Sequence, residues 1–172
     1  MSFNVFIDTE FTDFLDPQLI SIGLVAQSGE EFYAELPYEV RECSEFVKAA
    51  VFPLLGYAPH AEMSQEDLYL EMTNWLRLVR PKDQEVFICY DYQTDWDLFY
   101  DVLDGRVPPW CRRRLVADQI SELLRYEFHW KNKLPEHHAL NDAKANYYAF
   151  RELPPASTSK TRCIELRDNS SV

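Results

Sequence analysis

The sequence predicts an α/β protein in which one mixed β-sheet is flanked by helices. Three segments near the N-terminus have the composition of β-strands and are separated by short turn-like stretches. Beyond residue 60, helical and strand-like segments alternate along the chain. Strands that come first, followed by alternating helices and strands, favour a sheet that opens with antiparallel strands and continues with parallel ones.

The first three strands are predicted at residues 3–8, 18–26 and 30–36. Residues 3–8 read Phe-Asn-Val-Phe-Ile-Asp and are rich in strand-forming side chains, and residues 18–26 form a nearly continuous apolar run. Ser28 and Gly29 mark a turn between the second and third strands. This order predicts an antiparallel meander.

The later elements are predicted from helical spacing and from breaker residues. Ser64 and Asp67 resemble a helix-start signal, and apolar residues recur at helical spacing from there to Pro81. The remaining predicted elements are a buried strand at residues 85–90, a helix at 95–103 capped by Thr94, a strand at 114–117, a short helix at 119–126 and a last helix at 140–150. In the last helix, one stripe carries Leu140, Ala143, Tyr147 and Phe150.

Composition excludes several classes of protein. The chain has 172 residues, of which 47% are hydrophobic and 27% are charged, which is typical of one globular domain rather than a disordered or repetitive chain. We expect that domain at residues 1–153 and a polar tail at residues 154–172. There is no run of 18 apolar residues and no basic, apolar leader, so neither a membrane span nor secretion is expected.

Cysteine usage and charge narrow the expectation further. The cysteines at positions 43, 89, 111 and 163 have no CxxC or zinc-site spacing, and a reduced, cytoplasmic protein fits this pattern. A net charge of -12 disfavours a protein that coats nucleic acid. It does not disfavour an enzyme whose carboxylates hold divalent cations, because bound cations reverse the local field.

The first candidate site is Asp8-Thr9-Glu10, at the end of the first predicted strand. Side chains alternate between the faces of a strand, so Asp8 and Glu10 point to one face and Thr9 to the other. Two neighbouring carboxylates repel unless a cation or proton intervenes, and hard ions such as Mg²⁺ or Mn²⁺ prefer oxygen ligands. The alternative is an ordinary strand end, because chance alone gives about one Asp-x-Glu in such an acidic chain.

The second candidate is Asp95, in the first turn of the helix that follows the buried strand. A carboxylate there lies near the rim of the sheet, within reach of the first pair, while Leu98 and Phe99 anchor the helix. The alternative is that Asp95 only interacts favourably with the helix dipole. Asp91 and Asp97 are rivals for the same role.

The third candidate is His137 with Asp142, at the start of the last helix. Five residues span about 140° beyond a full helical turn, so His137 is expected in the preceding loop, reaching across to the site. Asp142 would then be a metal ligand and His137 a general base, since histidine exchanges protons near neutral pH. A surface or capping histidine is the alternative for both His137 and His138.

The order of the three motifs resembles that of the DEDDh 3′-to-5′ exonuclease superfamily, the nucleases related to polymerase proofreading domains and oligoribonuclease. The resemblance extends over residues 3–152, and residues 6–10 followed by 19–23 look like the first hairpin of that family. Phe11 directly after the first motif and the small chain are most similar to bacterial exoribonucleases of the mycobacterial type.

This resemblance implies an RNase H-like fold and a nuclease that releases nucleoside 5′-monophosphates from the 3′ end of single-stranded RNA. It implies two divalent metal ions, Mg²⁺ or Mn²⁺, held by Asp8, Glu10, Asp95 and Asp142, with His137 as the general base. It also implies a homodimer as the assembly.

The chain departs from the family pattern after the first motif. Many members continue with Thr and Gly, whereas this chain has Phe11 and Thr12. Phe11 could stack on the terminal base, with Thr9 as a further substrate contact, or Phe11 and Phe14 could pack in the core. The run at residues 112–114, three arginines, could meet phosphates or could simply lie at the surface.

Other functions stay open at this point. A proofreading-type DNA exonuclease uses the same motifs, and a non-catalytic scaffold could keep the fold, although a scaffold does not need a general base beside a carboxylate cluster. An acidic mimic of nucleic acid would suit the charge, but the acids are spread along the chain. The four glycines form no GxGxxG, P-loop or GxSxG pattern, which excludes those cofactor and hydrolase classes.

Overall fold

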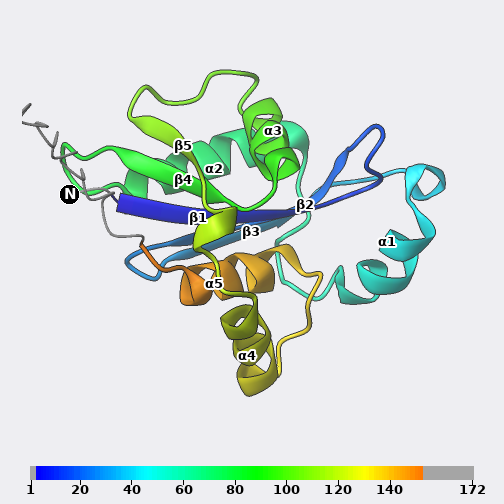
Figure 1. The fold of residues 1–172 in the computed structure, drawn as a ribbon. Helices are drawn as coiled ribbons and strands as arrows, with labels where there is room; N and C mark the ends of the chain where they lie inside the picture. Colours follow the sequence, from blue (N-terminus) through cyan, green and yellow to red (C-terminus); the bar gives the residue numbers. More distant parts are fainter. Residues whose placement is uncertain (1–2, 153–172) are drawn as a thin grey trace, which may run out of the picture.

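A computed structural model describes residues 3–152, which form one sheet with helices on both faces (Figure 1). The strands are β1 (Phe3–Phe11), β2 (Leu19–Ala26), β3 (Glu31–Glu35), β4 (Val86–Tyr90) and β5 (Cys111–Leu115). The helices are α1 (Glu45–Ala50), α2 (Gln65–Val79), α3 (Gln93–Val102), α4 (Glu122–Asn132) and α5 (Ala139–Ala149). Short 3-10 turns lie at Val40–Glu42, Phe52–Leu54 and Ala117–Gln119. The predicted tail, residues 154–172, lies outside the described residues.

The strand order is β3-β2-β1-β4-β5, which makes β1 the central strand. The pairs β1–β2 and β2–β3 are antiparallel, and the pairs β1–β4 and β4–β5 are parallel. The predicted mixed sheet, antiparallel in its first strands and parallel in its later ones, is therefore confirmed. The carboxyl ends of β1 and β4 lie at the same edge of the sheet, because these strands run in the same direction.

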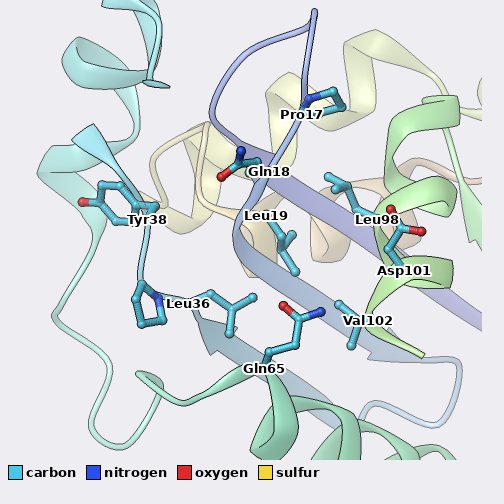
Figure 2. Close-up of a pocket in the computed structure, with 10 residues that line it drawn as sticks. Pro17, Gln18, Leu19, Leu36, Tyr38, Gln65, Leu98, Asp101 and Val102 are labelled. Carbon is cyan, nitrogen blue, oxygen red and sulfur yellow. The ribbon is translucent and has the colours of Figure 1, made fainter. Parts of the chain in front are cut away.

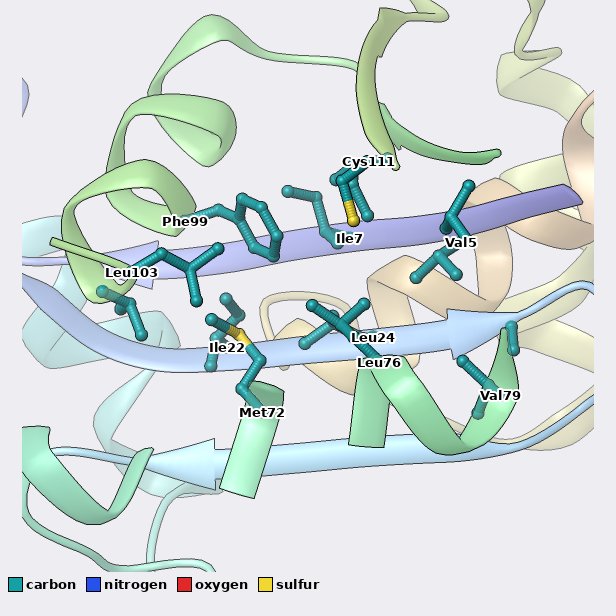
Figure 3. Close-up of a cluster of buried hydrophobic side chains, with 14 of the residues drawn as sticks. Val5, Ile7, Ile22, Leu24, Met72, Leu76, Val79, Phe99, Leu103 and Cys111 are labelled. Carbon is teal, nitrogen blue, oxygen red and sulfur yellow. The ribbon is translucent and has the colours of Figure 1, made fainter. Parts of the chain in front are cut away.

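Side-chain alternation in β1 divides the core into two layers. Val5 and Ile7 pack with α2 and α3, as Figure 3 shows, whereas Phe6 packs with Ala143 of α5 on the other face. Each fully buried aliphatic or aromatic side chain contributes about 1.5–3 kcal/mol relative to an exposed one. This packing fixes the direction of β1, so Asp8 and Glu10 share a face with Phe6, and Thr9 shares a face with Ile7.

Helix α5 lies unusually close to the sheet because β2 has a glycine beneath it. A Cβ atom added to Gly23 would lie 2.3 Å from the backbone nitrogen of Leu140, in the first turn of α5. Gly23 is also the β2 partner of Asp8. The missing side chain therefore lets the start of α5, which carries Asp142, approach the end of β1.

We expect Gly23→Ala to destabilise the protein by about 1–3 kcal/mol, because the added methyl group meets helix backbone rather than a flexible side chain. Urea unfolding followed by circular dichroism measures this change. An unfolding midpoint equal to that of the unmodified protein would show that α5 can move away from β2 at no cost.

Several predicted boundaries differ from the structure. Helix α3 begins at Gln93, before the predicted cap Thr94, because Asp95 accepts a hydrogen bond from the backbone N–H of Tyr92 at 3.3 Å and so closes the first turn two residues earlier. Strand β5 begins at Cys111 rather than at residue 114, in register with Val86 of β4. The helix predicted at 119–126 begins only after Ser121.

The buried face of α5 is wider than the predicted stripe, of which Ala143 is buried and Tyr147 and Phe150 pack against Phe6. It is made of small and polar side chains, whereas Tyr147 is exposed and Leu140 is half-buried. The close approach at Gly23 leaves room only for small residues on that face. The buried residues are Ala139, Asn141, Asp142, Ala143, Ala145, Asn146 and Ala149.

Two further expectations can be compared with the structure. Cys43, Cys89 and Cys111 are buried free thiols. Within residues 3–152, no helix has the length and apolar character needed to cross a bilayer.

Candidate active site

A pocket of about 660 Å³ opens where β1 and β4 end and where α1, α3, α4 and α5 converge. All the side chains predicted to form the site line this pocket: Asp8, Thr9, Glu10, Phe11, Asp95, His137 and Asp142. They come from β1, from α3 and from the loop and first turn at α5. The fold therefore brings together residues that are up to 134 positions apart in the chain, from Asp8 to Asp142.

The acidic side chains form two adjoining groups. Ligand atoms of Glu10, His137 and Asp142 all lie within 4.8 Å of one another. Ligand atoms of Asp8, Asp95 and Asp91 do the same. The alternation along β1 explains the arrangement, because Asp8 and Glu10 project from the same face of one strand, with one residue between them.

Asp95 is buried and held by β1. Its Oδ1 accepts hydrogen bonds from the backbone N–H of Thr9 at 3.1 Å and from the Thr9 hydroxyl at 2.6 Å. Its Oδ2 accepts from the backbone N–H of Tyr92. Thr9, which points away from Asp8 and Glu10, thus fixes the third carboxylate beside them.

The rivals of Asp95 separate clearly in the structure. Asp97 is outside the pocket, where it accepts a hydrogen bond from Gln93 at 2.8 Å. Asp91 lines the pocket together with Asp95. Asn146 donates to Asp91 Oδ1 at 2.9 Å, and Arg125 donates to Asp91 Oδ2 at 3.0 Å.

His137 lies in the loop before α5, as predicted, and faces the carboxylates. Its φ angle of 64° places it in the left-handed region, and its backbone N–H donates to Asp142 Oδ2 at 2.8 Å. Its ring packs edge-on against Phe46, with centroids 5.0 Å apart. His138 instead stacks on Tyr33, 4.5 Å between centroids, and does not line this pocket.

A second histidine, His129 of α4, lies behind Asp142. Its Nε2 is 3.0 Å from Asp142 Oδ1, and its Nδ1 is 3.1 Å from the carbonyl oxygen of Leu134. The adjacent Asp142 carboxylate raises the pKa of His129. Asp142 is therefore oriented from two sides, by His137 through the backbone and by His129 through its ring.

The pocket raises the pKa of its carboxyl groups. Burial, reinforced by Asp95, Asp142 and Glu10, raises the pKa of Asp8 well above its ordinary value. Burial together with Asp142 and Asp95 raises the pKa of Glu10 to about 8. Burial raises the pKa of Asp95 to about 7, against the opposing effect of its hydrogen bond from Thr9.

These groups fit divalent cations. Asp142 Oδ1 is buried and, among the described residues, is paired only with the His129 ring, so it keeps a lone pair for a cation. Ionised carboxylates packed this closely repel each other, and a hard dication with oxygen ligands relieves that repulsion. Glu10 and Asp142 would contribute to one ion, and Asp8 and Asp95 to another.

The stability of the metal-free protein should fall as the pH rises from about 5 to 8. Glu10 and Asp95 keep protons in the folded state at pH values where the unfolded chain has lost them, so the unfolded state binds fewer protons and the slope of unfolding free energy against pH is negative. The slope reaches about 1.4 kcal/mol per pH unit for each such proton. Saturating Mg²⁺ should flatten it, because the cation favours the ionised carboxylates.

Urea unfolding at pH 5 and pH 8, with EDTA and with Mg²⁺, measures this dependence. Glu10→Gln should show a smaller fall in EDTA, because it removes one of the raised groups. Equal or greater metal-free stability at pH 8 than at pH 5 would contradict this electrostatic picture.

Several residues that line the pocket are not predicted by the sequence patterns. Phe46 lies on α1, in a segment for which no helix is predicted, and Arg125 lies on α4 without a motif around it. Tyr92, next to the candidate Asp91, and Phe14, which is 71% exposed, form an edge-to-face aromatic pair, 5.9 Å between centroids. The alternative of core packing is therefore wrong for Phe14. Phe11 is half-buried and packs edge-on against Phe14 at 5.1 Å.

The three consecutive arginines do not reach the pocket. Arg112 pairs with Glu85 at 2.7 Å, and Arg114 bonds to Asn4 and Gln119, all remote from the carboxylates. A different pocket, between Leu19, Leu98 and Val102, is shown in Figure 2. Its lining contains a single carboxylate, that of Asp101, so it offers no comparable constellation.

Known proteins match this chain in structure but not in sequence. No family model matches the chain, and no curated protein matches it in sequence. Among solved structures, the chain is similar to the nuclease domain of 3′hExo, a DEDDh family member, in a crystal structure with bound rAMP. The TM-score is 0.55 and the identity 14%, over 84% of this chain and 88% of that one. The likeness establishes an RNase H-like α/β fold for this chain.

Proposed function

We propose that this protein is a metal-dependent 3′-to-5′ exoribonuclease that acts on single-stranded RNA or 3′ overhangs. One observation carries the proposal: four carboxylates and a histidine from distant parts of the chain line one pocket. They are Asp8, Glu10, Asp95, Asp142 and His137. The fold shared with a DEDDh nuclease domain supports the same proposal.

The carboxylates would hold two divalent ions, Mg²⁺ or Mn²⁺. When bound, such a pair supplies Lewis-acid activation of water and neutralises the charge that develops on the leaving oxygen. The chain's own contribution is to hold four ionised side chains at fixed positions. Thr9 fixes Asp95, and the backbone N–H of His137 fixes Asp142.

His137 would act as the general base. Its ring lies in the pocket, close to Glu10 and Asp142, and can accept the proton that the attacking water loses. Phe46 packs against the ring and limits its orientation. Attack of this water on the last phosphodiester breaks the bond between phosphorus and the 3′ oxygen of the preceding nucleotide. A nucleoside 5′-monophosphate is then released from the 3′ end.

Aromatic side chains would bind the terminal nucleotide by stacking on its base. Phe11, Phe14 and Tyr92 form a connected edge-to-face series along one wall of the pocket. Aromatic faces stack on bases without reading their sequence, and only unpaired bases offer free faces. This wall supports a preference for single strands.

The preference for RNA over DNA rests on two similarities. The sequence motifs resemble those of small bacterial exoribonucleases of the mycobacterial type, and the nuclease domain of similar fold binds rAMP. A 3′-to-5′ DNA exonuclease is the alternative. A non-catalytic scaffold is less well supported, because it would not require His137 beside the carboxylates.

Product ladders test direction and sugar preference together. The protein is incubated with 5′-labelled single-stranded RNA, matched DNA or a duplex with a 3′ overhang, in Mg²⁺, in Mn²⁺ and in EDTA. We expect a ladder that shortens one nucleotide at a time from the 3′ end, faster with RNA and absent in EDTA. Faster digestion of DNA would assign the alternative, and shortening from the 5′ end would reject the proposed polarity.

We also propose a homodimer in the cytoplasm. Helix α4 exposes Leu123, Tyr126 and Trp130 at helical spacing on one face, which is an apolar surface suited to a second copy. A light-scattering mass of about twice 20.3 kDa is expected. A monomer mass would reject the dimer and leave the nuclease proposal unaffected.

A further inference from the structure

The pocket holds one cationic side chain that the proposed mechanism does not use. Among residues 3–152, Arg125 is the only Lys or Arg that lines it, against six carboxylates. Arg125 lies on α4, and its side chain is 26% exposed. It also borders the smaller adjoining pocket beside His137 and Asp142, so its guanidinium stands on the same side as the proposed base.

Arg125 is anchored at one of its nitrogens only. Nη1 lies 3.0 Å from Asp91 Oδ2 and 3.4 Å from Glu122 Oε1. Within the described residues, Nε and Nη2 make no hydrogen bond. A guanidinium has five N–H donors in a planar fork, so several donors remain free to bind another group.

Asp91 holds Arg125 in position through a hydrogen bond and is itself held by a second one. Both of its oxygens are occupied, Oδ1 by Asn146 and Oδ2 by Arg125. Asp91 directly follows β4, and Asn146 belongs to α5, so the arrangement ties the sheet to α4 and α5 at the rim of the pocket. The anchor therefore sets the position of the guanidinium relative to the carboxylates.

We infer that Arg125 contacts the phosphodiester that is cleaved, held in place by Asp91. The inference rests on the proposed nuclease function. Phosphate oxygens are the anionic partners that a guanidinium binds best, through paired N–H donors. A fixed cation that faces charge developing on a reacting phosphate lowers the barrier without reorganisation. An arginine so placed also offsets part of the repulsion between an anionic strand and an acidic pocket.

The simpler alternative is that Arg125 only neutralises Asp91. A double substitution separates the two roles. If neutralisation is the whole role, Asp91→Asn combined with Arg125→Ala removes both charges and activity returns. If Arg125 contacts phosphate, Asp91→Asn alone is faster than Arg125→Ala, because the arginine is still present, and the double variant stays as slow as Arg125→Ala.

The test measures kcat and KM on 5′-labelled single-stranded RNA in Mg²⁺ for the full chain. We expect Arg125→Ala to lower kcat about 10²-fold, Arg125→Lys to lower it less, and the double variant to show no recovery. Arg112→Ala is the matched control, because Arg112 forms a surface ion pair with Glu85 near the far end of β4. Urea unfolding of each variant shows whether a loss of activity comes from a loss of folded protein. If Arg125→Ala does not fold, Arg125→Lys takes its place in the comparison.

Two results would overturn the inference while the nuclease function stands: kcat of Arg125→Ala within twofold of the Arg112→Ala control, or recovery in the double variant. If Arg125→Ala does not fold, Arg125→Lys is used in its place. A kcat of Arg125→Lys equal to that of Arg112→Ala would then overturn the inference. Absence of hydrolysis by the folded unmodified protein overturns the proposed function and the inference with it.

Discussion

Asp142→Asn should lower hydrolysis by about 10³-fold or more while the protein stays folded. The substitution keeps shape and an oxygen acceptor for the backbone N–H of His137, but removes the charge that would hold a dication beside Glu10. Charge stabilisation by a metal ion is worth several kcal/mol, and each 1.4 kcal/mol is a factor of ten in rate. The metal-free variant should stay folded, because the substitution relieves the repulsion of Asp142 with Asp8 and Glu10 while it weakens the pair with His129.

Initial rates on single-stranded RNA in Mg²⁺ measure this effect, with unfolding curves in EDTA as the test of the fold. Asp97→Asn is the matched control, because Asp97 is an acid on α3 that lies outside the pocket. It should retain full activity. Full activity of Asp142→Asn would show that the carboxylate group around Asp142 is not needed for hydrolysis.

His137→Asn should lower kcat by about 10²- to 10⁴-fold without weakening metal binding. The loss reflects removal of the general base. Asparagine is chosen because His137 has a φ angle of 64°, a left-handed conformation that asparagine adopts more readily than most residues. The hydrogen bond from the backbone N–H to Asp142 is then kept, so the carboxylates stay in place.

Titration of Mn²⁺ into the variant, followed by calorimetry, separates a base from a metal ligand. Unchanged affinity with a lower kcat is expected for a base, whereas weaker Mn²⁺ binding would make His137 a ligand of the ion held by Glu10 and Asp142. His60→Asn is the control, because His60 is exposed and has the same φ angle of 64°. It should leave the rate unchanged.

Local patterns predict the elements with strong periodicity. The strand-forming runs at β1, β2 and β4 and the helical spacing of α2 are visible in the sequence because each buries a regular apolar face. The period of two residues in a strand is enough to assign Asp8 and Glu10 to one face of β1. The mixed sheet follows from the order of the elements.

Features that depend on contacts between distant segments are not predictable in the same way. The buried face of α5 is widened by Gly23 on β2, so apolar spacing within the helix finds only the part of that face that packs on Phe6. The segment that contains α1 has no regular apolar period, although it brings Phe46 to His137. Arg125 enters the site only because α4 packs beside α5, next to Asp91.

The choice among Asp91, Asp95 and Asp97 shows the limit of spacing alone. All three lie within seven residues, and a helix start can point any one of them toward the sheet. The structure separates them by their partners: Thr9 for Asp95, Arg125 for Asp91, and Gln93 at the surface for Asp97. The partners of Asp95 and Asp91 come from distant segments and carry no signal in a local pattern, whereas Gln93 and Asp97 form a local pair within α3.

The most direct test of a metal-dependent nuclease centre is chromatography of the products from single-stranded RNA. The unmodified protein and Asp142→Asn are prepared side by side and incubated with the same RNA in Mg²⁺, so that a contaminating nuclease would act in both. We expect nucleoside 5′-monophosphates from the unmodified protein and none above background from Asp142→Asn. Equal release from both proteins, or no release from the folded unmodified protein in either Mg²⁺ or Mn²⁺, would contradict this expectation.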